Sequence, residues 1–404
     1  MSSMTLPFAP LMARFKASES TEAGARARAL RAEGYHVVDF SIGEPDFPVP
    51  DNVKKAIVEA LERDDTHYTN TGGTPELIDA VRAKFARENR LEYGRNQIII
   101  SSGAKSVMYH AFACTVSAGD EVIVPVPYWI SYPNQVRIAG GTPVFVECDP
   151  DDGFQLDILA IEKAITSRTR WLVLNSPNNP TGGVLSEHTL RALADMLSRH
   201  PQVLIMSDEI YEHLWYGDAV HRSIVEFDER LKERTLIVNG VSKAYAMTGL
   251  RIGYGAGPSD LIQAMIRLQS QTTSCSSSLG QAGAVAALLG SGDVVEERRR
   301  IMERRRDYLA QRLEAIPGLQ VKAPAGSMYF FCDCRGLLGK KTPDGQSLES
   351  DIDVVRYLLD QYKLVVIQGS AYGRPGFFRI SFATSHENLE EGSARLREAC
   401  AALK

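Results

Sequence analysis

The chain has 404 residues, of which 44% are hydrophobic and 24% are charged. This balance is that of a globular protein, and the length favours one large domain with a smaller companion. The net charge of −5 is spread along the chain, so the sequence offers no basic stripe for nucleic acid or an anionic membrane surface.

Cysteines and apolar runs give an expectation for the cellular compartment. A disulfide framework is not expected, because the cysteines follow no repeating spacing: Cys114, Cys148, Cys275, Cys332, Cys334 and Cys400. The N-terminal stretch lacks a long apolar segment with a small-residue cleavage site, and nowhere do about eighteen apolar residues run together. We therefore expect a cytoplasmic protein.

In chain order, residues 1–48 contain too few strand-like runs to fold alone, so we expect them to pack with the C-terminal domain. Residues 49–290 alternate short Val- and Ile-rich runs with amphipathic helical segments. The runs are QIIIS (97–101), DEVIVPVP (120–127), TPVFVEC (142–148), RWLVLNS (170–176), VLIMSDE (203–209), TLIVNG (235–240) and RIGYGAG (251–257). The alternation predicts a large α/β domain whose mainly parallel sheet carries helices on both faces.

From residue 291 the pattern changes, which predicts a smaller α+β domain over 291–404. A long charged helix is followed by strand-like runs, and a terminal helix is expected from His386. The runs are MYFFCDC (328–334), LVVIQG (364–369) and FFRISFA (377–383). The mixed charges of Glu296–Arg306 favour a solvated helix face over a binding patch.

Ligands of open α/β sheets bind beyond the carboxyl ends of the strands, and four unusual segments follow predicted strands. The first is SKAYAMTGLRIGYG, Ser242 to Gly255. A lone lysine after a strand is usually an ordinary loop residue. Here Lys243 can condense with an aldehyde, while Ser242 and Arg251 supply a hydroxyl and a guanidinium for a phosphate.

The second segment places Asp208 at the end of the apolar run VLIM, with Tyr211 three residues later. A buried carboxylate needs a partner, and a pyridinium nitrogen is one. Tyr211 can then reach the hydroxyl of the same ring. A helix N-cap aspartate followed by a packing tyrosine explains this segment equally well.

The third and fourth segments are NSPNNPTG, Asn175 to Gly182, and the turn in ISSGAK. Turn formation explains the Pro and Gly of the former, whereas the amide of Asn179 can hydrogen-bond a ring oxygen. In the latter, Gly103 and Ala104 open a helix whose backbone N–H groups can bind phosphate, although most such turns only join a strand to a helix.

Taken in this order, the segments resemble the class I/II aminotransferases of the fold-type I pyridoxal-phosphate family. Further similar segments are GEPDF (43–47), YTNTGG (68–73), PYWISY (127–132) and FFRISFAT (377–384), so the resemblance covers nearly the whole chain. It is greatest to the bacterial aspartate aminotransferase branch that often also accepts prephenate. The resemblance implies a seven-stranded large domain with a smaller α+β domain, pyridoxal 5'-phosphate as cofactor and no metal.

The resemblance also implies roles for individual residues. Trp129 would stack on the cofactor ring, and Tyr68 would reach the phosphate in a neighbouring subunit, which implies a homodimer with shared active sites. Arg379 would bind the substrate α-carboxylate as a bidentate fork, in a pocket lined by Gly43 and Asn179. Without the resemblance, Trp129 and Tyr68 would be read as ordinary core aromatics.

Two lysines bear on specificity. Lys105, beside the cofactor turn, would pair with the distal carboxylate of aspartate or glutamate. Lys16 would meet the second carboxylate of prephenate, although a solvated N-terminal lysine is an equal alternative. Leu250 stands where close relatives usually carry Trp, which puts local packing and substrate range in question.

The implied activity is ping-pong transfer of an amino group between L-aspartate or glutamate and 2-oxoglutarate or oxaloacetate, with prephenate as a further candidate acceptor. Lys243 would bond the cofactor and move the proton, and Asp208 would keep the ring cationic. Alternatives are aromatic or other amino acid specificity, or β-elimination or decarboxylation on the same cofactor. A transcription regulator would need an added DNA-binding domain, for which the chain has no room.

Overall fold

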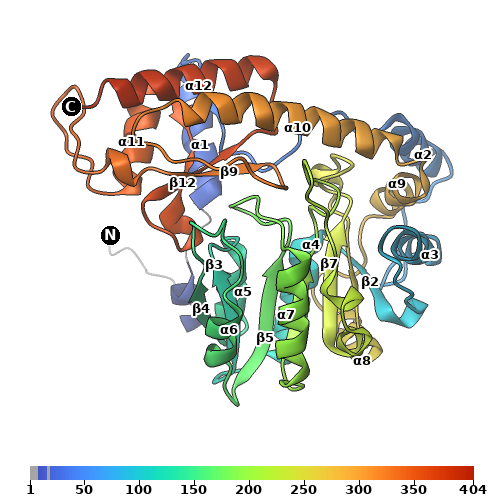
Figure 1. Ribbon diagram of the computed structural model, residues 1–404. Coiled ribbons are helices and arrows are strands. Elements are labelled where there is room, and N and C mark those ends of the chain that lie inside the picture. The colour runs from blue at the N-terminus through green and yellow to red at the C-terminus, as the bar shows by residue number, and fades with distance from the viewer. Residues whose placement is uncertain (1–7, 16–18) are drawn as a thin grey trace, which may run out of the picture.

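The computed structural model describes residues 8–15 and 19–404 (Figure 1). Its centre is a seven-stranded sheet. In spatial order the strands are β2 (Ile98–Ser101), β8 (Gly253–Ala256), β7 (Thr235–Gly240), β6 (Leu204–Asp208), β5 (Thr169–Asn175), β3 (Glu121–Val126) and β4 (Thr142–Glu147). Only β8 runs antiparallel to its neighbours, so the predicted mainly parallel sheet is confirmed.

Alternating side chains divide each strand between two apolar layers. Ile98 and Ile100 belong to one layer, whereas Ile99 belongs to the other. Helices cover both faces of the sheet: α2 (Asp51–Glu62), α3 (Pro75–Lys84), α4 (Ala104–Thr115), α5 (Ser131–Ile138), α6 (Ile158–Ala164), α7 (Glu187–Ser198), α8 (Ser259–Gln269) and α9 (Ser278–Leu289). The sheet is therefore buried on both faces, which explains why its strands are almost continuously apolar.

Helix α7 shows how the sequence sets a helix and its buried face. The Ser186 side chain accepts a hydrogen bond from the backbone N–H of Thr189 and so caps the helix. Leu190, Leu193 and Leu197 recur at the helical period and are all buried in one layer. This helix lies where its spacing predicts.

The C-terminal elements form a second apolar cluster with part of the N-terminal segment. A three-stranded antiparallel sheet has the order β11 (Ile367–Gln368), β12 (Phe377–Ser381) and β9 (Tyr329–Asp333). Beside it, β1 (Val38–Asp39) pairs in parallel with β10 (Leu364–Val365). The surrounding helices are α1 (Glu19–Ala32), α10 (Asp293–Glu314), α11 (Asp351–Tyr362) and α12 (His386–Ala401). The domain division at residues 48 and 290 stays a prediction.

Two sequence expectations need correction here. The run LVVIQG is not one strand, because its first half pairs with β1 and its second half with β12 in a different sheet. Helix α11 was not anticipated, although Ser350 caps it and Val354 and Leu358 bury one side. Among the described residues, we find no helix long and apolar enough to cross a membrane.

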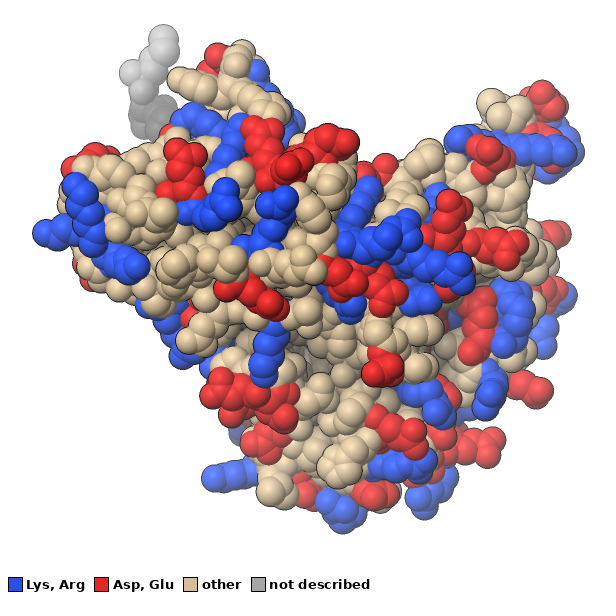
Figure 2. Space-filling model, turned by 45° about the horizontal axis from the view of Figure 1, so that its top comes forward, with Lys and Arg blue, Asp and Glu red and all other residues tan. Residues whose placement is uncertain are grey.

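The interpretation of Glu296–Arg306 as a solvated face is wrong for part of α10. This helix crosses from the C-terminal cluster toward α9 (Figure 1), so one side of it faces protein. Arg298 is 6% exposed and donates hydrogen bonds to the carbonyls of Ala244 and Pro48. Arg305 donates hydrogen bonds to the Asp46 carboxylate from its terminal nitrogens Nη1 and Nη2, at 2.6 and 2.9 Å. On the face of the molecule that Figure 2 shows, acidic and basic side chains are interspersed.

We predict that Gly392→Ala destabilises the protein although the site is helical. A Cβ at this position in α12 would overlap the ring of Phe40, which is fully buried beside β1. Overpacking of this kind typically costs about 1–3 kcal/mol. Gly24→Ala in α1 is the matched control, because its Cβ would meet only the end of the Arg28 side chain, at 3.4 Å. Urea unfolding should show a lower free energy for Gly392→Ala and a gain of up to about 1 kcal/mol for Gly24→Ala.

Candidate active site

A cleft of about 390 Å³ lies beyond the carboxyl ends of the central strands. Asn175 ends β5, Asp208 ends β6, and Ser242 and Lys243 follow β7. The cleft brings together most of the predicted site residues: Gly43, Ala104, Lys105, Trp129, Asn179, Asp208, Tyr211, Ser242, Lys243, Arg251 and Arg379. These residues come from positions 43 to 379, so the fold rather than sequence proximity assembles the site.

Asp208 is 3% exposed at the end of the central strand. Burial raises the pKa of its carboxyl to about 6, and hydrogen bonds from the Tyr132 hydroxyl and the Ile210 amide only partly offset this effect. No helix begins after Asp208, so the alternative reading as a helix N-cap does not apply. A buried carboxylate that lines a cleft favours a cationic ligand.

Lys243 points its amine at the N-terminal segment, where Nζ donates a hydrogen bond to the carbonyl of Gly43 at 2.5 Å. Burial lowers the pKa of this amine, which increases the share of its neutral, nucleophilic form. Tyr211 lies beside it, with the Lys243 Nζ 5.8 Å from the ring centroid. The Tyr211 hydroxyl is 2.9 Å from that of Tyr329.

The part of the cleft around Arg251 suits an anionic ligand. Arg251 lies against the turn that opens α4, where its guanidinium occupies the space that a side chain on Gly103 would need. On the other side, a Cβ on Gly253 would overlap the backbone nitrogen of Ala104. Gly103 has φ +90° and does not itself line the cleft. Backbone N–H groups at a helix start and an adjacent guanidinium together suit a phosphate, and Ser242 adds a hydroxyl.

Arg379 forms a second anion-binding feature. It is 3% exposed, and its Nη1 and Nη2 donate to Asn179 Oδ1 at 3.0 Å and to the Ser41 carbonyl at 2.7 Å. Its Nε–H has no hydrogen-bond partner among the described residues. The guanidinium lies 4.2 Å from the ring centroid of Tyr329. An unpaired N–H on a buried cation beside a cleft suits a carboxylate ligand.

Lys105 and Trp129 lie together on another wall of the cleft. The Lys105 ammonium is 4.9 Å from the centroid of the Trp129 ring. Partial burial lowers the pKa of Lys105, and the cations Arg251 and Lys243 lower it further. The cleft thus concentrates positive charge, which suits an anionic substrate.

Besides Gly103, two predicted residues are not found in this cleft. Tyr68 is 92% exposed and lies in a separate surface groove with residues of α2 and α9. Lys16 lies outside the described residues. Leu250 is partly buried against the larger apolar cluster.

Sequence reasoning assigned no role to three residues that line the cleft. Tyr132 bonds Asp208, and its place three residues after Trp129 at a helix start was the available signal. Tyr329 contacts both Tyr211 and Arg379, and only its position in a predicted strand was visible. Ser41 offers a backbone carbonyl, for which no side-chain pattern exists.

The N-terminal residues Ser41–Pro48, called the strap from here on, form one edge of the cleft. The Gly43 and Ser41 carbonyls accept hydrogen bonds from Lys243 and Arg379, and the Glu44 carboxylate accepts one from Thr248. With Arg305 bound to Asp46 and Arg298 to the Pro48 carbonyl, the strap is anchored along its whole length.

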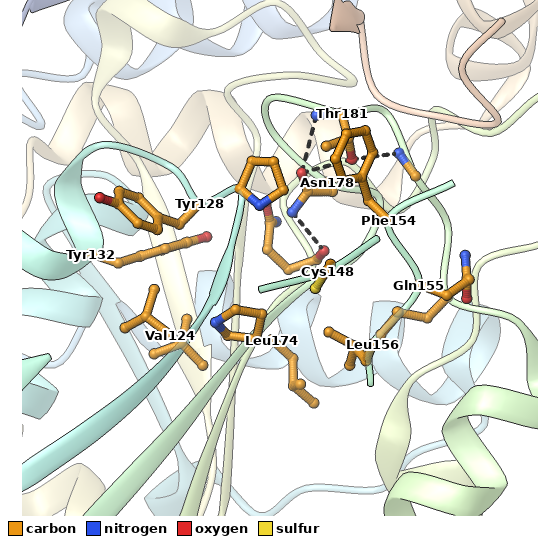
Figure 3. Close-up of a pocket in the computed structure, with 16 residues that line it drawn as sticks. Val124, Tyr128, Tyr132, Cys148, Phe154, Gln155, Leu156, Leu174, Asn178 and Thr181 are labelled. Carbon is orange, nitrogen blue, oxygen red and sulfur yellow. Dashed lines mark hydrogen bonds between the residues drawn. The ribbon is translucent and has the colours of Figure 1, made fainter. Parts of the chain in front are cut away.

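A smaller cavity lies behind Tyr132 and also touches Asn175 (Figure 3). Its described lining includes Val124, Leu174 and Cys148 but no Asp, Glu, Lys, Arg or His. Burial raises the pKa of the Cys148 thiol to about 12, so that thiol is not a nucleophile at neutral pH. This cavity offers no acid, base or nucleophile of its own.

Comparison with known proteins gives one consistent picture. Over 98% of this chain and 99% of the relative, the sequence is 45% identical to a probable aspartate/prephenate aminotransferase of Rhizobium leguminosarum. The crystal structure of the Rhizobium meliloti aspartate aminotransferase is 46% identical, with a TM-score of 0.96 over 99% of this chain and 100% of that one. The Thermus thermophilus aspartate aminotransferase with maleate is 37% identical, with a TM-score of 0.91 over 98% and 100%.

The family model for class I and II aminotransferases matches residues 35–396, which span the strap, the sheet and both anion-binding parts of the cleft. Together with the full-length similarities, this match shows that the chain belongs to the class I and II aminotransferases.

Proposed function

We propose that this aminotransferase binds pyridoxal 5'-phosphate and moves the amino group between L-aspartate or L-glutamate and a 2-oxo acid. The observation that carries the proposal is that four groups line one cleft. They are Arg251, which lies against the α4 turn, Asp208, Lys243 and Arg379. Each group matches one part of the cofactor or of the substrate.

The described residues fit the proposed cofactor. Arg251, Ser242 and the amide of Ala104 would hold its phosphate, and Asp208 would pair with its ring nitrogen. The predicted role of the Gly103 amide is not supported, because its N–H donates to the Ser101 carbonyl at 2.7 Å. Trp129 would cover the ring face, while Asn179 and Tyr211 would donate hydrogen bonds to its ring oxygen. When bound, pyridoxal phosphate supplies an aldehyde that condenses with amines and a ring that withdraws electrons from the substrate.

Lys243 would perform the proton transfer. Its lowered pKa favours the neutral amine, which takes a proton from the α-carbon of the bound amino acid as a general base. Asp208 would hold the proton on the ring nitrogen, because a charged partner offsets the cost of burying its carboxylate. Arg379 would orient the substrate by gripping its α-carboxylate, with the unpaired Nε–H as one donor.

A second cation besides Arg379, the ammonium of Lys105, indicates the class of substrate. Lys105 would pair with the distal carboxylate of aspartate or glutamate, since its ammonium lines the same cleft as Arg379. A dicarboxylate is also what the Thermus relative was solved with, because maleate carries two carboxylates. Prephenate as an acceptor, with Lys16 as its partner, stays part of the proposal. Transfer from aromatic amino acids is the alternative specificity.

We further propose a homodimer in the cytoplasm. Tyr68 is 92% exposed and does not reach the cleft of its own chain, which suits a residue that completes the cleft of a second copy by contacting the phosphate there. The six cysteines are all unpaired, as is usual for a reducing compartment.

The central test measures oxaloacetate formed from aspartate and 2-oxoglutarate. We expect the parent enzyme to be active and Lys243→Ala to lose at least about 10²–10⁴-fold in rate, the usual contribution of a general base. Borohydride should fix the cofactor to Lys243 in the parent. An adduct at another lysine in the variant would overturn the assignment. Ammonia or CO₂ released without oxaloacetate would indicate elimination or decarboxylation instead.

A second prediction concerns the stability of the cofactor-free protein. Asp208 binds its proton more tightly in the folded state, with a pKa of about 6 against 3.8, so its stabilising contribution falls as pH rises from about 4 to 6. We therefore expect Asp208→Asn to raise the free energy of unfolding at pH 7 by up to about 3 kcal/mol, and by less than about 1 kcal/mol at pH 4. Urea unfolding at the two pH values checks this, and a variant less stable than the parent at pH 7 would contradict it.

The third prediction separates substrates. Removing one charge-assisted hydrogen bond costs about 1.5–3 kcal/mol, so Lys105→Ala should lower kcat/KM for aspartate and glutamate by roughly 10- to 150-fold. Alanine lacks the distal carboxylate, and its kcat/KM should change far less. Lys163→Ala, an exposed lysine in α6, is the control and should leave both values unchanged. Equal decreases in kcat/KM for all substrates would indicate that Lys105 acts on the cofactor and not on the distal carboxylate of the substrate.

A further inference from the structure

Two carboxylates lie on the same turn as Asp208 and Tyr211 but do not line the cleft. They are Glu209 and Glu212, which are 1% and 5% exposed. Beyond Asp208, the turn that follows β6 keeps one backbone hydrogen bond to the sheet, from the Glu209 N–H to the Val238 carbonyl of β7 at 2.9 Å. Within it, the Glu212 N–H donates to the Glu209 carbonyl at 2.9 Å and the Leu214 N–H donates to the Tyr211 carbonyl at 2.8 Å. At its far end, the Leu214 carbonyl accepts a hydrogen bond from the Ser327 N–H at 2.7 Å, and side-chain contacts add to these backbone hydrogen bonds.

Glu212 makes more of these contacts than its position in a turn requires. Its carboxylate pairs with the Lys84 ammonium and accepts hydrogen bonds from Asn89 at 2.9 Å and Asn239 at 2.6 Å. Lys84 is fully buried and also donates to Asn89 at 2.7 Å. These partners belong to α3, to the π-helical turn Phe85–Asn89 and to β7. Glu212 thus ties the turn to three neighbouring elements.

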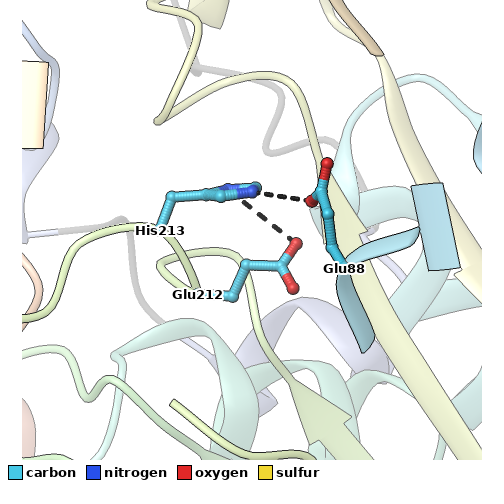
Figure 4. Close-up of side chains that lie close together, drawn as sticks. All are labelled: Glu88, Glu212 and His213. Carbon is cyan, nitrogen blue, oxygen red and sulfur yellow. Dashed lines mark hydrogen bonds and ion pairs between the residues drawn. The ribbon is translucent and has the colours of Figure 1, made fainter. Parts of the chain in front are cut away.

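Further charged groups surround this ion pair. His213 is 2.9 Å from Glu88, and His221 is 3.3 Å from Glu209. Glu88, Glu212 and His213 are close enough together to suggest a cation site (Figure 4). However, the Lys84 ammonium contacts Glu212 and lies 3.7 Å from Glu88. The network therefore already contains its own cation.

Stability alone does not account for a fully buried ion pair. The desolvation of two charges is so costly that a well-packed apolar pair of similar size is often as stable or more stable. What such a pair does provide is a fixed geometry, because each charge has few satisfactory positions. Of the two residues adjacent to Glu212 in the chain, Tyr211 lines the cleft, whereas His213 does not.

We propose that the Lys84–Glu212 ion pair positions Tyr211, so that the Tyr211 hydroxyl is held at the cleft from behind. The inference rests on the proposed function, in which that hydroxyl donates to the ring oxygen of the cofactor. Among the residues that the structure describes, the Tyr211 hydroxyl has one hydrogen-bond partner, the hydroxyl of Tyr329 at 2.9 Å. Lys84 and Glu212 are positioning residues, since neither lines the cleft.

The test follows the position of the Tyr211 hydroxyl through the absorbance of the bound cofactor. In the holoenzyme, the apparent pKa obtained from the pH dependence of the cofactor absorbance should rise when the ring oxygen loses a donor. Tyr211→Phe removes the hydroxyl altogether and should therefore give the largest increase in this pKa, which we expect to be about one pH unit. Glu212→Gln, which is isosteric, should raise this pKa by at least about half as much and lower kcat about tenfold with little change in KM.

Two further variants separate positioning from folding. Lys84→Met with Glu212→Gln removes both charges but keeps an amide oxygen as acceptor for Asn89 and Asn239, so this double variant should unfold near the parent temperature yet show the raised absorbance pKa. Glu121→Gln is the matched control, because Glu121 is a buried carboxylate paired with Arg168 at the start of β3, whereas the cleft lies beyond the carboxyl ends of the strands. It should leave the absorbance pKa unchanged.

The outcomes distinguish this inference from the function beneath it. If Tyr211→Phe shifts the absorbance pKa and neither Glu212 variant does, the positioning role is overturned and the proposed function stands. If Tyr211→Phe itself has no effect while the absorbance of bound cofactor persists, the role of Tyr211 fails and the inference fails with it. If no Glu212 variant folds, the pair is needed for stability, and the proposal is equally overturned.

Discussion

The burial of one carboxylate governs the architecture of the active site. Asp208 ends the middle strand of the sheet, almost out of contact with water, and its raised pKa reflects the cost of keeping it charged there. Neighbouring elements contact Asp208 at this position. The Tyr132 hydroxyl donates a hydrogen bond to its carboxylate, and Asn175, at the end of β5, donates one to its backbone carbonyl. A buried carboxylate at this place favours a cationic group, as the proposed cofactor ring would be, and the cations Lys105, Arg251 and Arg379 favour anionic ligands.

The sequence was informative wherever one local rule decides the outcome. Strands buried on both faces are continuously apolar, so the runs around Leu204–Asp208 and Thr235–Gly240 could be located without a structure. Lys243 and Asp208 were found because they follow such strands. Tyr329 and Ser41 were missed because their contributions depend on contacts between distant elements.

Helix α10 gives a second example of burial that the local sequence does not predict. Alternating charges at helical spacing normally indicate a solvated face, and for Arg300 that holds. Arg298 follows the same local pattern but lies against protein, where two backbone carbonyls satisfy its guanidinium. Nothing in the local sequence separates these two arginines. Only the path of α10 between the two apolar clusters decides which of them is buried.

The strap also has a consequence for how the molecule is made. It is synthesised early, yet Gly43 contacts a lysine 200 positions later, and Ser41 contacts an arginine 338 positions later in β12. Contacts of such high sequence separation form late, because most of the chain must already be in place. Until β12 has emerged, the Ser41 carbonyl has no arginine to bind. The cleft is thus closed along this edge last, so that only a nearly completed chain presents a finished site to cofactor or substrate.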